Sequence, residues 1–130
     1  MAEGSILEDV REACNLNRDD SSFDGQLIPL INTQLMMAHQ FGVGYSGFTI
    51  SDNTALWSGW LGSAESDLAA VKTWVGYQVL LLFDPPDNNS LLNSYKDQIE
   101  KFEWMLREKV EEKGYVKDYV PEKASFYEDK

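Results

Sequence analysis

Apolar residues recur at helical spacing in four stretches of the chain, and each stretch predicts a helix. The first helix begins at Ser5, whose side-chain oxygen can accept from the amide of Glu8 while the glutamate reaches back, as in a capping box. We expect this helix to end by residues 15–17, because a polar linker occupies residues 17–22. Its apolar positions are Ile6, Leu7, Val10, Ala13 and Cys14.

The second predicted helix opens at residues 23–24, with Asp24 as its N-cap. Pro29 lies early enough in this helix to be tolerated, although it can tighten or kink the first turns. Gly42 follows the last apolar position and predicts the end of the helix. The apolar face consists of Leu27, Ile31, Leu35, Ala38 and Phe41.

Residues 42–62 lose the helical period and carry five glycines together with Trp57 and Trp60. We predict a long ordered loop here. A short hairpin is a second interpretation, because two apolar triplets, residues 48–50 and 55–57, flank a polar turn. The two indoles suit a core position, a protein interface or, least well, a small-molecule pocket.

The third helix is expected to start near Ser63, with Glu65 and Asp67 in its first turn, where carboxylates suit the helix dipole. Its C-terminal half is apolar on nearly all sides, which predicts a central buried helix. Two successive prolines at residues 85–86 end it.

The fourth helix takes Asp87, Asn88 or Asn89 as its cap and ends at Gly114. Its opposite face carries charges in two acid-first pairs four residues apart, Asp97–Lys101 and Glu103–Arg107, which we expect to interact. Its apolar stripe alternates by three and four residues through Leu92, Tyr95, Ile99, Phe102, Leu106 and Val110.

These elements predict an all-α fold with about four helices around one core, in a domain of residues 1–114. Residues 115–130 form a C-terminal tail with neither helical nor strand period, which is either frayed or docks on a partner. Its aromatic residues are Tyr115, Tyr119, Phe126 and Tyr127. Together with Trp57 and Trp60, these are the residues that we predict to contact a partner.

The charge of the chain narrows the functions that it can have. Its 130 residues carry a net charge of −11, and from Asp19 to Tyr95 the only basic residue is Lys72, against eight acidic ones. Such a surface repels phosphate, so a protein that grips nucleic acid through its backbone is nearly excluded. Cys14, the only cysteine, predicts a buried structural thiol in a reducing cytoplasm. We expect neither a secretory signal nor a membrane span.

No pattern in the chain predicts catalysis, a cofactor or a metal. The glycines of residues 42–47 fit G-x-G-x-x-G, but a dinucleotide site needs a strand before them and a helix after, and the predicted order is the reverse. The only histidine, His39, lacks the partners of a triad or a zinc site. Asp84 is better explained as the polar end of a helix.

The order of three motifs resembles the small head-tail connector (adaptor) proteins of tailed phages. The first is residues 6–11 followed by 23–27, the second is residues 40–44 with 48–50 and Trp57, and the third is Leu82-Phe83-Asp84-Pro85-Pro86 leading into residues 98–104. Together they cover about residues 6–110. The chain departs from many relatives at Met105, where a basic residue is usual, although Arg107 lies half a turn on.

The resemblance implies a structural virion protein rather than an enzyme. Such a subunit assembles into a ring, often twelve-fold, below the portal of the head, extends the DNA channel and links the head to a stopper or tail-completion protein. DNA passes through the ring without sequence-specific binding. The resemblance therefore implies that the subunit lies in the virion neck, after assembly in the host cytoplasm. The alternative is an acidic helical protein that mimics DNA and inhibits a nucleic-acid enzyme. That function requires acidic side chains aligned on one face.

Overall fold

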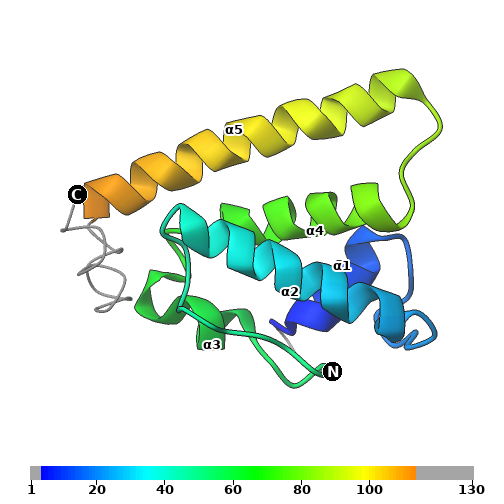
Figure 1. Cartoon of the computed structure of the whole chain (residues 1–130), viewed down its shortest axis with the longest axis horizontal. Helices are drawn as coiled ribbons and strands as arrows, with labels where there is room; N and C mark the ends of the chain where they lie inside the picture. Colours follow the sequence, from blue (N-terminus) through cyan, green and yellow to red (C-terminus); the bar gives the residue numbers. More distant parts are fainter. Residues whose placement is uncertain (1–3, 114–130) are drawn as a thin grey trace.

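The computed structural model describes residues 4–113 and, within them, has five α-helices, one short 3-10 helix and no strand (Figure 1). The prediction of an all-α fold is therefore confirmed. The only β-type pairing among these residues is an isolated bridge between Ser5 and Leu56. The elements are α1 (Ile6–Ala13), α2 (Asp24–Gln40), α3 (Trp57–Leu61), η1 (Gly62–Ala64), α4 (Ala70–Phe83) and α5 (Asn89–Lys113).

Helix α4 lies at the centre of the molecule, between α5 on one side and α1 and α2 on the other (Figure 1). Its buried side chains include Val71, Trp74, Val75 and Val79, and Gly76 packs against the methyl group of Ala13. The predicted central helix is thus confirmed, except that Leu82 near its C-terminus is 59% exposed. Burial of an apolar helix on both sides joins the two outer layers into a single core.

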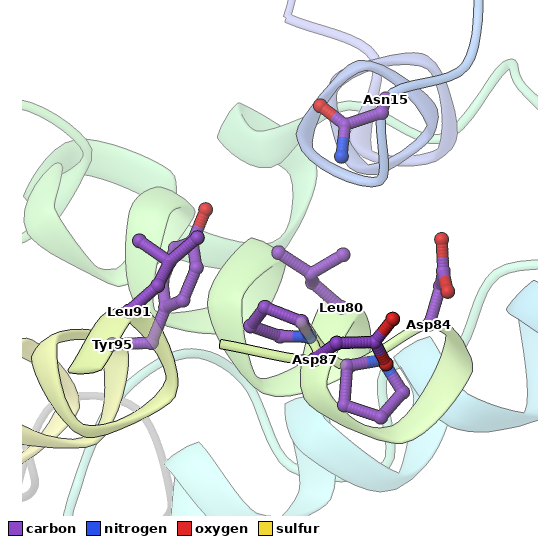
Figure 2. Close-up of a pocket in the computed structure, with 8 residues that line it drawn as sticks. Asn15, Leu80, Asp84, Asp87, Leu91 and Tyr95 are labelled. Carbon is purple, nitrogen blue, oxygen red and sulfur yellow. The ribbon is translucent and has the colours of Figure 1, made fainter. Parts of the chain in front are cut away.

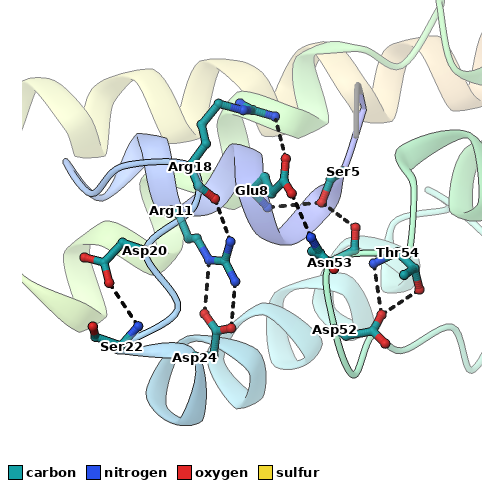
Figure 3. Close-up of polar contacts among 10 residues, drawn as sticks. All are labelled: Ser5, Glu8, Arg11, Arg18, Asp20, Ser22, Asp24, Asp52, Asn53 and Thr54. Atoms are coloured by element: carbon teal, nitrogen blue, oxygen red, sulfur yellow. Dashed lines mark hydrogen bonds and ion pairs between the residues drawn. The ribbon is translucent and has the colours of Figure 1, made fainter. Parts of the chain in front are cut away.

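Helix α1 begins as its capping residue predicts, since the Ser5 oxygen accepts from the Glu8 amide at 3.2 Å. The carboxylate of Glu8 does not return to the cap but accepts from Asn53 Nδ2 at 2.8 Å, and the Ser5 hydroxyl donates to the Asn53 carbonyl at 2.9 Å (Figure 3). The start of α1 therefore holds the distant loop in place. Its end is a left-handed turn at Asn15 (φ 67°), a conformation that asparagine tolerates.

Helix α2 begins at Asp24, but Asp24 is not the N-cap that the sequence predicts. Phe23 occupies the cap position without a side-chain hydrogen bond. The Asp24 carboxylate instead receives two hydrogen bonds from the Arg11 guanidinium, at 3.1 and 2.7 Å, which tie α2 to α1 (Figure 3). The predicted end is confirmed: Gly42 (φ 97°) follows the C-cap, and the amides of Gly42 and Val43 donate to carbonyls of the last turn, as in a Schellman motif.

The segment from residue 42 to residue 64 is ordered, but it is neither a continuous loop nor a hairpin. Leu56 pairs with Ser5 instead of with residues 48–50, so the hairpin interpretation is wrong, and α3 and η1 follow directly. The polar turn forms as predicted. The amide and hydroxyl of Thr54 donate to Asp52 at 2.9 and 2.6 Å, and these bonds lower the pKa of the Asp52 carboxyl (Figure 3).

The third long helix begins later than predicted. Turns occupy residues 65–69, and α4 starts at Ala70 rather than near Ser63. The expected position of Glu65 and Asp67 in the first turn of this helix is therefore wrong. The Glu65 carboxylate reaches forward to Lys72 instead, with 3.0 Å between Oε2 and Nζ.

The predicted N-cap and apolar stripe of helix α5 are confirmed. The Asn88 side chain accepts from the Leu91 amide at 3.1 Å, and Ile99, Leu106 and Val110 are buried. The predicted Glu103–Arg107 pair is wrong, because each side chain has another partner. Glu103 accepts from Trp74 Nε1 at 3.0 Å, and the Arg107 guanidinium lies over the Phe41 ring, 4.6 Å from its centroid. Asp97 and Lys101 form no ion pair in the part of α5 that is described.

Candidate interaction surfaces

Trp57 and Trp60, which we predicted to contact a partner, lie entirely inside the core. Both side chains are 0% exposed, and their ring centroids are 6.1 Å apart. Trp57 Nε1 donates to Asp9 at 2.7 Å, which satisfies its buried N–H group. Neither indole is accessible to a partner. Of the three positions that the sequence left open, the structure therefore shows the core position, and the prediction of a partner contact is wrong for both residues. The predicted contacts of the four tail aromatics lie outside the described residues.

The glycines after α2 have structural roles that explain the apparent nucleotide motif. Gly42 ends the helix, and Gly44 (φ 81°) lies against the Trp60 indole, which a Cβ atom at that position would overlap. His39 Nδ1 is 3.0 Å from the Gly44 carbonyl oxygen, so the histidine holds the chain where it leaves α2. A helix precedes these glycines, as the sequence predicts, and their backbone serves the packing of Trp60.

The corner between α4 and α5 forms a shallow hollow of about 250 Å³ (Figure 2). Asp84 is the C-cap of α4, as predicted, and Asp87 and the two prolines complete the rim. Nearby Cys14 is 2% exposed, and its thiol has a pKa raised to about 11, first by burial and second by the Asp84 carboxylate. Because a thiol with such a pKa stays protonated, Cys14 is the inert core residue that the sequence predicts.

Within residues 4–113, the structure has neither a metal-ligand cluster nor a membrane-spanning helix. No group of three or more His, Cys, Asp and Glu side chains in this part of the chain is arranged to hold a metal ion. Among the helices formed there, none combines the length and the apolar character needed to cross a bilayer.

Helix α2 presents an outer face without charge. The whole of α2 is described, and none of its exposed residues is charged in a chain with net charge −11. Met36 and Met37 are 57% and 42% exposed on this face. Charge depletion and methionine are both typical of the centre of protein interfaces. We call this surface the α2 face; it consists of Gly25, Gln26, Pro29, Thr33, Met36, Met37 and Gln40.

The outer side of α5 exposes a tryptophan that sequence reasoning did not select. Trp104 is 65% exposed, the most of any large hydrophobic residue in the described part, and Met105 beside it is 47% exposed. The signal was available, because the apolar stripe of α5 places residue 104 on the opposite side of the helix. We call this surface the Trp104 patch; it consists of Trp104, Met105 and the helical neighbours Glu100, Lys101, Arg107 and Glu108.

The exposed residues of α5 carry both signs of charge. Asp97, Glu100 and Glu108 are interspersed with Lys96 and Lys101. A protein that mimics DNA needs a continuous row of negative charge, and these lysines interrupt it.

Comparison with known proteins and protein families indicates the family of this chain. No curated protein and no solved structure matches the chain significantly. The sequence profile of a family described as "Phage connector protein" matches residues 6–113, which include all five α-helices. On this match, the chain belongs to the phage connector protein family.

Proposed function

We propose that this chain is the adaptor subunit of the virion neck. In this role it assembles as a ring of twelve subunits below the portal, extends the DNA channel, and presents its far side to a stopper or tail-completion protein. The observation that carries the proposal is the family match over residues 6–113, because family membership implies a structural role at the head-tail junction and not an enzymatic one. Assembly in the host cytoplasm precedes incorporation into the virion.

The charge of the chain supports passage of DNA without capture. Each phosphate held by a lysine or arginine releases counterions and adds affinity, so a basic channel would retain the genome. With 22 acidic against 11 basic residues, this subunit offers few such contacts. The acidic composition therefore suits a wall past which DNA must slide.

Two kinds of surface are available for protein partners. The α2 face and the Trp104 patch present apolar side chains on the described domain. The aromatic tail, residues 115–130, is the segment that we propose docks on the portal or the stopper, because its four aromatic residues suit the centre of an interface.

Co-sedimentation with purified portal rings tests this proposal. We expect the full chain to bind the portal, and a chain that ends at residue 114 to remain folded but lose most of this binding. As a matched control, a full-length chain with its four tail aromatics changed to serine should behave like the truncated chain. Failure of the full chain to bind portal rings would contradict the adaptor function. Normal binding by the truncated chain would contradict only the role of the tail.

The alternative of a DNA mimic fits the net charge of −11 but not the lysines that interrupt the acidic residues on α5. Its characteristic result would be the capture of a nuclease or polymerase by the purified protein, with binding reduced when acidic residues of α5 are neutralised. The interleaved lysines of α5 predict that this capture does not occur.

A further inference from the structure

We propose that copies of this chain associate head to tail, with the α2 face of one copy against the Trp104 patch of the next. This inference rests on the ring under "Proposed function" and names the surfaces that would form it. The juxtaposed groups are the two methionines exposed on α2 and the tryptophan exposed on α5.

Electrostatic repulsion between two acidic copies favours contact through these two surfaces. Two copies that each carry a net charge of −11 repel one another, and the repulsion is greatest where acidic side chains meet. The α2 face carries no charged residue among those described. Directly beside Trp104, Glu100 and Glu108 are balanced by Lys101 and Arg107, while Asp97 and Glu111 add negative charge two turns away on the same side of α5. Because the α2 face is uncharged, contact between these surfaces does not bring acidic side chains of one copy against acidic side chains of the other.

The side chains of the two surfaces also suit each other. Tryptophan is enriched among the residues that dominate binding, and methionine adapts its shape and makes favourable contacts with aromatic rings. Trp104 has most of its surface in solvent, as does Met36. Burial of these side chains against each other removes apolar area from water on both copies.

The position of the surfaces makes the contact head to tail. Helix α4 lies between α2 and α5, so the two surfaces belong to different layers of the molecule (Figure 1). A copy that uses its α2 face still has its Trp104 patch free for another neighbour. Contacts of this kind propagate and close into a ring when the rotation between copies permits, whereas a two-fold dimer would pair the α2 face with itself or the Trp104 patch with itself.

Cysteine cross-linking tests which surfaces meet. Thr33→Cys places a thiol on the α2 face and Glu108→Cys places one beside Trp104, while buried Cys14 stays unreactive. A short bis-maleimide is added to each variant alone and to an equal mixture, at about 1 M NaCl, where the Debye length is about 3 Å. We expect several-fold more cross-linked dimer in the mixture than in either variant alone. Dimers that form mainly in the Thr33→Cys sample, or in neither sample nor the mixture, would overturn the proposal.

Sedimentation velocity provides a second readout. Association between neutral patches on an acidic protein should strengthen as salt rises from about 0.1 M to about 1 M, because screening shortens the Debye length from about 10 Å to about 3 Å. Met36→Glu should weaken association at least tenfold, and Met36→Leu should restore it. The matched control Ser90→Glu, which adds the same charge in the first turn of α5, should leave association unchanged at high salt.

Two outcomes would overturn the inference while leaving the adaptor function standing. One is a protein that remains monomeric at every salt concentration yet still binds portal rings. The other is equal loss of association in Met36→Glu and Ser90→Glu, which would show that total charge and not the α2 face controls assembly.

Discussion

Residues 42–64 and helix α5 both carry tryptophan, yet the first region buries Trp57 and Trp60 completely, while α5 leaves Trp104 65% exposed. In the first region, glycine allows the backbone to approach the indoles, as Gly44 does at Trp60. In α5, a regular stripe faces the core and residue 104 lies opposite it. The difference shows that the setting of a tryptophan, and not its residue type, decides whether it stabilises the subunit or is free to contact another protein.

The largest effect should come from Gly44, which makes room for the buried Trp60. Gly44→Ala should lower the free energy of unfolding by about 3 kcal/mol, because it adds a left-handed backbone penalty to a clash with the indole. The matched control is Gly47→Ala, which has a similar φ of 73° but no atom within 4 Å of the new Cβ; it should cost about 1 kcal/mol. Urea unfolding of the two variants measures the difference, and equal losses would contradict the close packing of Trp60.

A comparison of the tryptophans themselves comes next. Trp57→Phe should destabilise the fold by about 2 kcal/mol, because it removes a hydrogen bond of 2.7 Å to the Asp9 carboxylate. The same change at Trp104 should alter stability by less than about 0.5 kcal/mol, since the side chain lies mostly in solvent. Thermal and urea unfolding provide both values, and a large loss at Trp104 would show that it supports the monomer.

The cap of α1, which contacts the loop of residues 42–64, differs from the cap of α5 in the same way. Ser5 is fully buried and makes two hydrogen bonds, one to its own helix and one to the Asn53 carbonyl. Ser5→Ala should therefore cost about 1.5 kcal/mol. Asn88→Ala, which removes only the exposed cap of α5, should cost about 1 kcal/mol or less. If the order is reversed, the contact between Ser5 and Asn53 does not hold the loop.

The smallest effect concerns Arg107, which contacts the Phe41 ring instead of Glu103. Arg107→Ala should cost about 0.5–1 kcal/mol through loss of the cation–π contact. Lys101→Ala is the matched control and should be close to neutral, because Lys101 is exposed and forms no described ion pair. A double-mutant cycle between Glu103→Gln and Arg107→Ala should give a coupling energy close to zero. A coupling energy of about 0.5 kcal/mol would show that the Glu103–Arg107 pair predicted from the sequence does form.

Much of the fold could be predicted from the sequence, because regular periods and end signals encode it. Ser5, Gly42 and Asn88 mark helix ends through local hydrogen bonds, and the stripe of α5 faces the core as its spacing indicates. Two other features depend on partners distant in sequence. Asp24 is drawn away from its predicted cap by Arg11, and Leu56 pairs with Ser5 instead of a hairpin strand.

The candidate surfaces were harder to predict than the fold. Trp57 and Trp60 lie in a glycine-rich segment without period, so the sequence gives no direction for their side chains. The direction of Trp104 was predictable, because the apolar stripe of α5 leaves this residue on the outer side of the helix. The α2 face is marked by the absence of charge at the exposed positions of α2, a pattern that the apolar face of this helix alone does not reveal.

Electron microscopy of this protein mixed with purified portal tests the proposed assembly most directly. We predict a closed ring of added density, coaxial with the portal, in which the α2 face of each subunit meets the Trp104 patch of its neighbour. Portal rings that carry no added density after mixing would contradict the adaptor function.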